Sequence, residues 1–371
     1  MAIKLSDNIY WVGAVDYDIR DFHGYRTPYG TSYNAYLVID EKVTLIDTVK
    51  ADFSHVLIDN ISEIIDPKEI DYIITNHVEP DHSGALPDVL EVTETPVIIT
   101  SPMGDKVLKA YYKKDWNVNI VKTGDSLSTG EYSFNFLQTP MVHWPDSMVT
   151  YLPEEKFLFS NDAFGQHLAS EERFEDEIGA ERVLERAKDY YANIIFPLGA
   201  QVRKILTEVS KLDISLIAPS HGVMWRKDIS TIVSKYTDWA NNKTNDDEGV
   251  IVYDTMWGST EILAQRIGDE FREKGIKVKI LSLKEHHISE VINQLLTAKY
   301  ICVGSSTLNR NILPNVAAFL TYMKGLAPKD RIGMAFGSYG WSGESVDIVE
   351  DTLRSCGFDI IDKLKVQYKP D

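Results

Sequence analysis

The chain of 371 residues is 44% hydrophobic, so it is long enough for two domains and apolar enough for two cores. Its 38 basic and 56 acidic side chains give a formal net charge of −18; such a surface repels phosphate backbones, and we expect no nucleic-acid partner. The only two cysteines, Cys302 and Cys356, lie in apolar segments and form no CxxC pair, which excludes a disulfide scaffold, an iron–sulfur site and an attached rubredoxin module.

The N-terminal sequence MAIKLSDNIYWVG has no signal-peptide core, and no apolar run approaches the roughly 20 residues that span a bilayer. We therefore expect a protein of the reducing cytoplasm without membrane association. Strand-like runs such as NIYWVGAV and VTLIDTV dominate the first half of the chain. Strands and helices alternate to about Val121, and more strands follow from Tyr132 to Phe159. This pattern predicts a layered α/β sandwich with mixed strands over residues 1–245.

Ligand-type side chains are concentrated in NHVEPDHSGALP (residues 76–87), directly after the apolar run YIIT. Three further strand-like runs, FLQTPMVH, FLFSND and SLIAPSH, also end in such a side chain. Together they provide four imidazoles and three carboxylates: His77, Glu79, Asp81, His82, His143, Asp162 and His221. Strand ends can converge at one sheet edge. Seven donors exceed the need of one tetrahedral zinc ion but suit two ions of higher coordination number with a bridging carboxylate.

A polar stretch without apolar side chains, NNKTNDDEG (residues 241–249), separates the two halves and predicts a domain boundary. Beyond it, five strand-like runs alternate with four helical ones, from GVIVYDT to DIIDKLKVQY. This alternation predicts a doubly wound parallel sheet over residues 249–371.

Three strand-end loops of this second domain suit a flavin monophosphate. YDTMWGSTE (residues 253–261) offers hydroxyls, a glycine and a helix N-terminus, and it resembles the flavodoxin T-x-T-G-x-T loop with Trp257 in place of the second Thr. It lacks the lysine of a P-loop and the G-x-G-x-x-G spacing, so FMN fits better than ATP or NAD. The expected FMN contacts are Thr255, Met256, Trp257, Gly258, Ser259, Thr260, Ser306, Thr307, Leu308, Asn309, Ser338, Tyr339, Gly340, Trp341, Ser342 and Gly343.

The spacing H-x-E-x-D-H, followed by a distant His, Asp and His, resembles the H-x-H-x-D-H signature of the metallo-β-lactamase superfamily. Glu79 stands where the zinc hydrolases carry histidine, and a carboxylate hardens the site and favours iron over zinc. Combined with a flavodoxin-like domain, the whole chain resembles the flavodiiron (A-type flavoprotein) family. The resemblance implies an αββα metallo-β-lactamase-like sandwich followed by a flavodoxin-like sheet.

The resemblance also assigns roles to residues. It places one iron on His77, Glu79 and His143, the other on Asp81, His82 and His221, and Asp162 between them. His23, in FHGYRTPYGTSYNAYLV, matches a family segment near the pocket, either as a proton donor or behind the ligands, with a packing role as the alternative. The remaining histidines, predicted to be surface or core residues, are His55, His167, His286 and His287.

The implied activity is reduction of dioxygen to water, nitric oxide to nitrous oxide, or both, with electrons passing through FMN to two irons. The implied partners are an external donor, rubredoxin or the reduced deazaflavin coenzyme, and further copies of the chain in a head-to-tail homodimer or a dimer of dimers. Two alternatives stay open on the residues alone. One is a zinc hydrolase with a flavodoxin-like docking domain, and the other is an electron carrier with a merely structural N-terminal domain.

Overall fold

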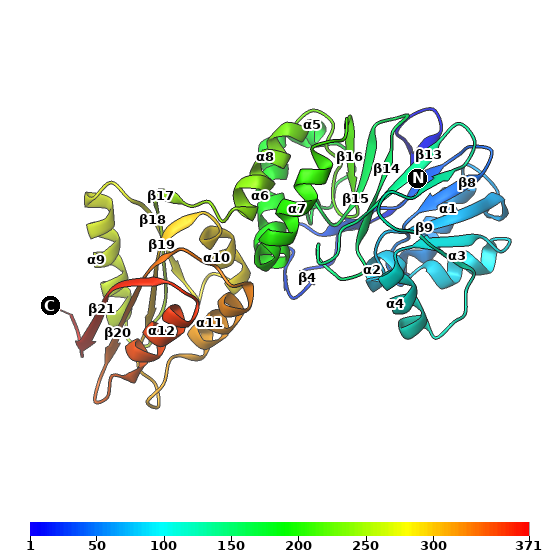
Figure 1. Ribbon diagram of the computed structural model, residues 1–371. Coiled ribbons are helices and arrows are strands. Elements are labelled where there is room, and N and C mark those ends of the chain that lie inside the picture. The colour runs from blue at the N-terminus through cyan, green and yellow to red at the C-terminus, as the bar shows by residue number, and fades with distance from the viewer. Residues whose placement is uncertain (371) are drawn as a thin grey trace. The chain divides into compact units, whose positions relative to one another are not determined.

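The computed structural model describes residues 1–370 (Figure 1). Its internal contacts divide the chain into two compact units. Unit 1 comprises Met1–Tyr190 and Ala200–Thr237, and unit 2 comprises Tyr191–Gly199 and the residues from Asp238 onward. Within residues 1–370, none of the helices combines the length and the apolar composition that crossing a membrane requires.

Unit 1 contains a seven-stranded mixed sheet in which β8, β9, β10 and β11 run parallel. In spatial order its strands are β1 (Ile3–Lys4), β2 (Ile9–Trp11), β7 (Tyr36–Val38), β8 (Val43–Ile46), β9 (Ile70–Thr75), β10 (Val97–Thr100) and β11 (Val118–Ile120). Both faces of its central strands are covered, which explains why IDYIIT and VIIT are largely apolar rather than alternating.

A second, five-stranded sheet packs face to face with the first. Its strands are β12 (Ser126–Ser128), β13 (Ser133–Gln138), β14 (Met148–Leu152), β15 (Phe157–Asn161) and β16 (Leu216–Pro219). Phe134 and Phe136 alternate with the exposed Asn135 along β13 and meet Ile74 and Ile99 of the first sheet in the core between the sheets. Since β13, β15 and β16 share one direction, their carboxyl ends lie at the same edge.

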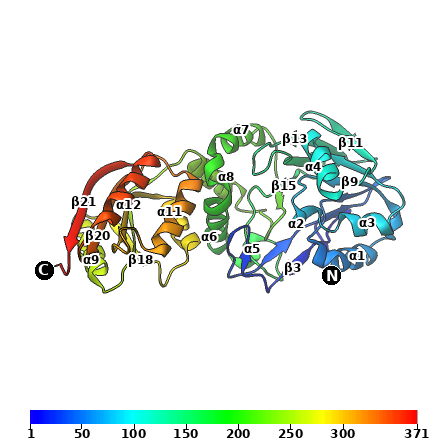
Figure 2. The ribbon, with the colours of Figure 1, turned by 90° about the horizontal axis from the view of Figure 1, so that it is seen from below.

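Helices cover both outer faces of this pair of sheets. Leu57, Val89 and Leu108, from α1, α3 and α4, pack on the first sheet, while α6, α7 and α8 lie beside β15 and β16 (Figures 1 and 2). The αββα sandwich expected for this half is therefore confirmed. The helices are α1 (Ser54–Ser62), α2 (Pro80–Ser83), α3 (Leu86–Val92), α4 (Pro102–Tyr112), α5 (Glu175–Ile178), α6 (Ala180–Tyr190), α7 (Gly199–Val209) and α8 (Ile229–Ala240). Two short strand pairs add β3 (Ala14–Asp16) with β6 (Thr31–Tyr33) and β4 (Asp21–Phe22) with β5 (Tyr25–Arg26).

Unit 2 is a five-stranded parallel sheet in the order β18-β17-β19-β20-β21, which confirms the expected doubly wound topology. Helix α9 packs on one face and α10, α11 and α12 lie on the other (Figure 1). The strands are β17 (Asn245–Asp254), β18 (Lys277–Ser282), β19 (Ala298–Ser305), β20 (Ile332–Tyr339) and β21 (Asp359–Gln367). The helices are α9 (Ser259–Glu273), α10 (Ile288–Leu295), α11 (Pro314–Leu326) and α12 (Glu344–Ser355).

The boundary region differs from the expected linker in two respects. Strand β17 begins at Asn245, inside the polar stretch. In addition, the segment Tyr191–Gly199 packs with unit 2: Tyr322 donates a hydrogen bond to Asn193 (2.8 Å), and the buried Arg331 guanidinium lies 5.9 Å from the Phe196 ring centroid. We keep residues 1–245 and 249–371 as the proposed domain limits and treat this segment as an addition to the second.

Candidate metal centre and cofactor pocket

The seven predicted ligands lie together at the carboxyl ends of strands from both sheets of unit 1. His77 follows β9 by two residues, and Asp162 and His221 follow β15 and β16. His143 comes from a longer loop, because β13 ends at Gln138 rather than running to His143 as expected. Pro140, which has no N–H to give to a ladder, lies in this loop.

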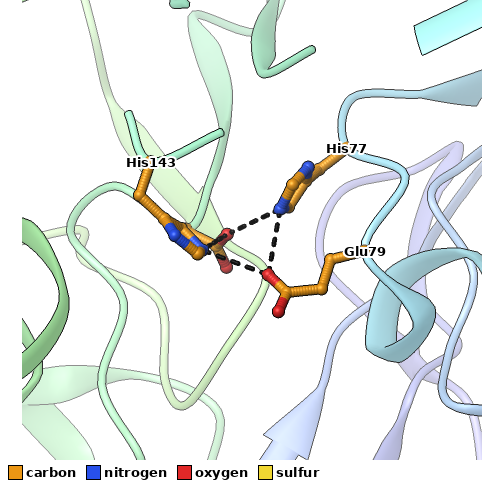
Figure 3. A group of neighbouring side chains, drawn as sticks. His77, Glu79 and His143 are labelled. Carbon is orange, nitrogen blue, oxygen red and sulfur yellow. Dashed lines mark hydrogen bonds and ion pairs between the residues drawn. The ribbon is translucent and has the colours of Figure 1, made fainter. Parts of the chain in front are cut away.

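The first group of donors is His77, Glu79, His143 and Asp162, whose ligand atoms lie within 4.8 Å of one another. Glu79 Oε2 lies 3.2 Å from Nε2 of both His77 and His143, and Figure 3 shows these three side chains converging. Asp162 Oδ2 completes the group at 3.2 Å from His143 Nε2 and 3.7 Å from His77 Nε2. This set of two imidazoles and two carboxylates can hold one cation.

The second group lies on the other side of Asp162. The Oδ1 atom of Asp162 is 3.1 Å from His82 Nε2 and 3.4 Å from His221 Nε2. Asp81 Oδ2 in turn lies 3.1 Å from His221 Nε2 and 3.2 Å from His82 Nε2. The two oxygens of Asp162 therefore face different groups, which is the arrangement that a bridging carboxylate requires.

The donor atoms fit a pair of metal ions because they are buried and unsatisfied. His77, His82, Asp162 and His221 are 0% exposed and Asp81 is 4% exposed. Within residues 1–370, both oxygens of Asp81 and of Asp162 and the Nε2 atoms of His82, His143 and His221 have no partner in hydrogen-bonding geometry. Buried charges without partners are costly, so this many in one place indicates that cations complete the site.

The pKa shifts of the ligand residues also show that positive charge is favoured in this site. Burial lowers the pKa of His77, but hydrogen bonds to Asp146 and Glu79 outweigh it and raise that pKa to about 10. Burial likewise opposes ionisation of Asp162, yet the imidazoles of His82 and His143 hold its pKa well below the ordinary value. At His221 burial dominates and the pKa is lowered, which leaves a neutral ring with a lone pair for a metal.

Two acceptors hold ligand imidazoles from behind. His77 Nδ1 lies 2.9 Å from Asp146 Oδ2, which also accepts from the Val78 amide at 2.8 Å. His221 Nδ1 donates to the Ser32 carbonyl at 2.7 Å, so its Nε2 faces the site without a proton. Such partners fix the tautomer and orientation of metal-binding histidines. Asp146 was not predicted, because no motif marks it; its position three residues after His143 is its only signal in the sequence.

His23 lies beside the second group. Its Nε2 is 3.4 Å from Asp81 Oδ2 and 3.7 Å from Glu79 Oε1, and its ring stacks on Phe22 with centroids 4.0 Å apart. It occupies the tip of the β4–β5 hairpin with a positive φ of 50°. The expected position of His23 near the pocket is thus observed, and its role stays a proposal.

His167, which was predicted to be a surface or core residue, lies beside the site, and the sequence did not indicate this position. His167 is buried, its ring lies 4.9 Å from His221 and 5.3 Å from His23, and its Nδ1 is 2.7 Å from Thr31 Oγ1. The buried Tyr190 lies 5.1 Å from it, ring to ring. Neither His167 Nε2 nor the Tyr190 hydroxyl has a hydrogen-bond partner within residues 1–370.

The carboxyl edge of the sheet in unit 2 forms two adjoining cavities of about 440 and about 150 Å³. The larger is lined by Met256, Trp257, Ser259, Ile262, Ser306, Thr307, Ser338, Tyr339, Gly340, Tyr368 and Lys369. The smaller is lined by Met256, Thr307, Leu308, Asn309, Gly340, Trp341 and Ser342. Trp257 and Trp341 are 91% and 78% exposed, so their rings are free to stack on a planar ligand.

Four predicted contacts line neither cavity but shape them. The Thr260 hydroxyl is fully buried and lies 3.0 Å from Ser306 Oγ and 2.9 Å from Ser338 Oγ, which joins the start of α9 to the ends of β19 and β20 in a hydroxyl triangle. Thr255 Oγ1 accepts from the Gly258 amide, and Gly258 and Gly343 precede α9 and α12. Ile262, Tyr368 and Lys369 line the larger cavity without having been predicted.

Comparisons with known proteins agree with both halves of this description. Residues 31–222 match the ODP family beta lactamase, and residues 251–371 match the flavodoxin family. The nitric oxide reductase of Moorella thermoacetica is 43% identical over 364 residues, 97% of this chain and 91% of that protein. The solved rubredoxin oxygen:oxidoreductase of Desulfovibrio gigas aligns with a TM-score of 0.98 at 43% identity, over 100% of this chain and 94% of that one. The flavodiiron protein of Giardia intestinalis gives 0.96 at 33% identity, over 100% and 92%.

Proposed function

This chain belongs to the flavodiiron family, and on that premise we propose that it is an oxidoreductase that reduces dioxygen to water, nitric oxide to nitrous oxide, or both. The cofactors of this proposal are two iron ions in unit 1 and FMN in unit 2. The similar proteins named for a nitric oxide or an oxygen reaction support the substrate class.

The observation that carries the proposal is the position of Glu79 between two imidazoles. Its Oε2 atom lies 3.2 Å from Nε2 of both His77 and His143, where a zinc hydrolase of this superfamily would present another neutral ring. An anionic oxygen donor stabilises the higher oxidation states of iron and disfavours zinc. The zinc-hydrolase alternative also leaves the flavodoxin-like cavities of unit 2 without a use.

The chain's own residues divide the work of holding the metals. One iron would lie among His77, Glu79 and His143, the other among Asp81, His82 and His221, with Asp162 joining them. When bound, FMN and two irons supply the four electrons that turn dioxygen into two waters, or the two that turn two nitric oxide molecules into nitrous oxide and water.

Both reactions consume protons, and the chain places polar groups on the side of the second ligand group for this purpose. His23 faces Asp81 and Glu79, and it is the residue that we propose to donate protons or to orient the substrate. The buried Nε2 of His167 and hydroxyl of Tyr190 belong to the same ring cluster. Their unsatisfied atoms can hold water or substrate oxygen by hydrogen bonds.

The two cysteines of these 371 residues form no rubredoxin-type centre, so our proposal includes an external electron donor for FMN. We propose rubredoxin or the reduced deazaflavin coenzyme as the donor. The name of the similar Desulfovibrio gigas protein, rubredoxin oxygen:oxidoreductase, supports rubredoxin. A head-to-tail homodimer, or a dimer of dimers, belongs to the same proposal and is tested by light scattering of the loaded protein.

The deciding experiment is to produce the protein in iron-supplemented medium and measure its metals, flavin and reactions together. We expect two irons and one FMN per chain, a yellow protein, and consumption of dioxygen or nitric oxide when reduced rubredoxin or deazaflavin is supplied. A colourless protein that holds zinc and hydrolyses esters or lactams would contradict the proposal.

A further inference from the structure

The larger flavin cavity has one charged residue among its described lining residues, Lys369, just beyond the end of β21. We propose that the Lys369 ammonium is a counter-ion for the 5′-phosphate of the flavin and makes the pocket prefer FMN over unphosphorylated riboflavin. The inference rests on the proposed function, because it assumes that this pocket holds the flavin.

Main-chain and side-chain hydrogen bonds hold this part of the chain beside the pocket. Strand β21 pairs with β20 up to Gln367 opposite Tyr339. The Tyr368 amide then donates to the Tyr339 carbonyl at 2.8 Å, and the Gln367 side-chain amide donates to the Gly340 carbonyl at 2.9 Å. Because Tyr339 and Gly340 line the cavity themselves, these bonds keep Lys369 at its wall.

The lining residues show at which end of the flavin Lys369 lies. It shares the larger cavity with Trp257 and Ser259 of the glycine-containing loop and with Ile262 in the first turn of α9. It is absent from the smaller cavity, which Asn309 and Trp341 line at the tips of the two other loops. The loop and the N-terminus of α9 are where amide N–H groups and the helix dipole favour an anion, so we expect the phosphate in the larger cavity, whose wall includes Lys369.

A phosphate at this place would otherwise meet only neutral donors. Ser259, Ser306 and Ser338 offer hydroxyls, whereas a phosphate monoester carries nearly two negative charges at neutral pH. The neighbouring Lys284 is already engaged, since its ammonium donates to the Thr255 carbonyl and lies 3.7 Å from Asp254 Oδ1. Within residues 1–370, the Lys369 ammonium has no acidic partner, and in a chain of net charge −18 it has a clear electrostatic use at this position.

The expected effect of Lys369 on FMN affinity is small because its side chain is exposed. Lys369 is exposed, so water and salt screen its attraction for the phosphate, and we expect its removal to weaken FMN binding about fivefold rather than by orders of magnitude. Riboflavin carries no phosphate, so its affinity should not change.

The test is a fluorescence titration of the full chain, after removal of its flavin, with FMN and with riboflavin separately. Lys369→Gln should raise the Kd for FMN about fivefold and leave that for riboflavin unchanged, Lys369→Arg should keep both, and added salt should erase the difference. Lys365→Gln, four residues earlier on β21 and paired with Asp347 at 2.8 Å, is the matched control and should change neither Kd.

Three results would overturn the inference: an unchanged FMN Kd in Lys369→Gln, an equal loss for FMN and riboflavin, or an equal loss in the Lys365→Gln control. These outcomes are separate from failure of the proposed function. If the unaltered protein binds neither flavin, the cofactor assignment itself is wrong and this inference is wrong with it.

Discussion

At the scale of single residues, Glu79 differs from the other donors in its proposed role, which is to make the site select iron over zinc. Its Oε2 atom lies 3.2 Å from Nε2 of both His77 and His143, and Asp162 Oδ2 faces the same two atoms at 3.7 and 3.2 Å. Replacing it with histidine would restore the superfamily's zinc-type pattern and remove one negative charge from the first group of donors.

We therefore predict that Glu79→His shifts the metal content from iron toward zinc. Even the loss of a partner behind a ligand costs about 10–100-fold in metal affinity or activity, so dioxygen or nitric oxide turnover should fall by at least that factor. Metal analysis after growth in iron-rich medium, with turnover measured on the same sample, checks this. A variant with two irons and normal turnover would show that Glu79 does not select the metal.

A second prediction concerns the ranking of Asp162 and His82. Asp162 faces both ligand groups, whereas the Nε2 atom of His82 faces Asp81 and Asp162 in the second group. Asp162→Ala should therefore lower the iron content to less than one ion per chain, while His82→Ala should retain at least one. Matched iron and turnover measurements on both variants test the ranking, and equal losses would refute it.

The ligand set could be predicted from residue types at strand ends, but the residues that support it could not. Asp146 and His167 reach the site through the loop after β13 and the segment after β15, and no local pattern distinguishes them from ordinary buried polar residues. Their role depends on contacts between residues far apart in the chain, such as Thr31 with His167. Only the packed structure provides that information.

At the scale of elements, the strands and helices of unit 2 were predictable because apolar strand sequences alternate with amphipathic helical sequences along the chain. Two departures have physical causes. The run expected to carry His143 at its end stops at Gln138, just before a loop that contains Pro140. The polar residues before Val250 still join β17, because Asn245 pairs with Ala298 of β19 and strand hydrogen bonds do not depend on apolar side chains.

A double substitution tests best the start of α9, where Ser259 and Thr260 form what we call the flavin cradle. Ser259 lines the larger cavity, and the Thr260 hydroxyl holds the triangle with Ser306 and Ser338. A charge-assisted bond from Ser259 is worth about 1.5–3 kcal/mol and a neutral bond of Thr260 about 0.5–1.5 kcal/mol, so Ser259→Ala with Thr260→Ala should weaken FMN binding by at least about 30-fold. Flavin content and titration measure this, with Thr352→Ala on α12 as the control.

The same double variant should leave the metal site intact, because all seven ligands lie in unit 1. We expect an unchanged iron content and an unchanged circular dichroism spectrum. Loss of iron together with flavin would show that the substitution damages the fold rather than the cradle, and the test would then be repeated with Ser259→Ala alone.

At the scale of the whole molecule, the proposed function combines a site that binds and reduces a small oxidant with a site that delivers electrons to it. The match of residues 31–222 and 251–371 to two separate families shows that each half is also a known unit. The central claim is that they work in series, with electrons passing from FMN to the metals. Neither the ligand geometry nor the cavity alone requires this order, so it needs a direct test.

That test is rapid-mixing spectroscopy of the flavin-free, iron-loaded double variant after chemical reduction of its irons. The account predicts that it reacts once with dioxygen or nitric oxide and then stops, even with reduced rubredoxin or deazaflavin present, and that the unaltered protein continues through many cycles. Sustained turnover at the normal rate without FMN would contradict the series arrangement and leave unit 2 as a docking domain.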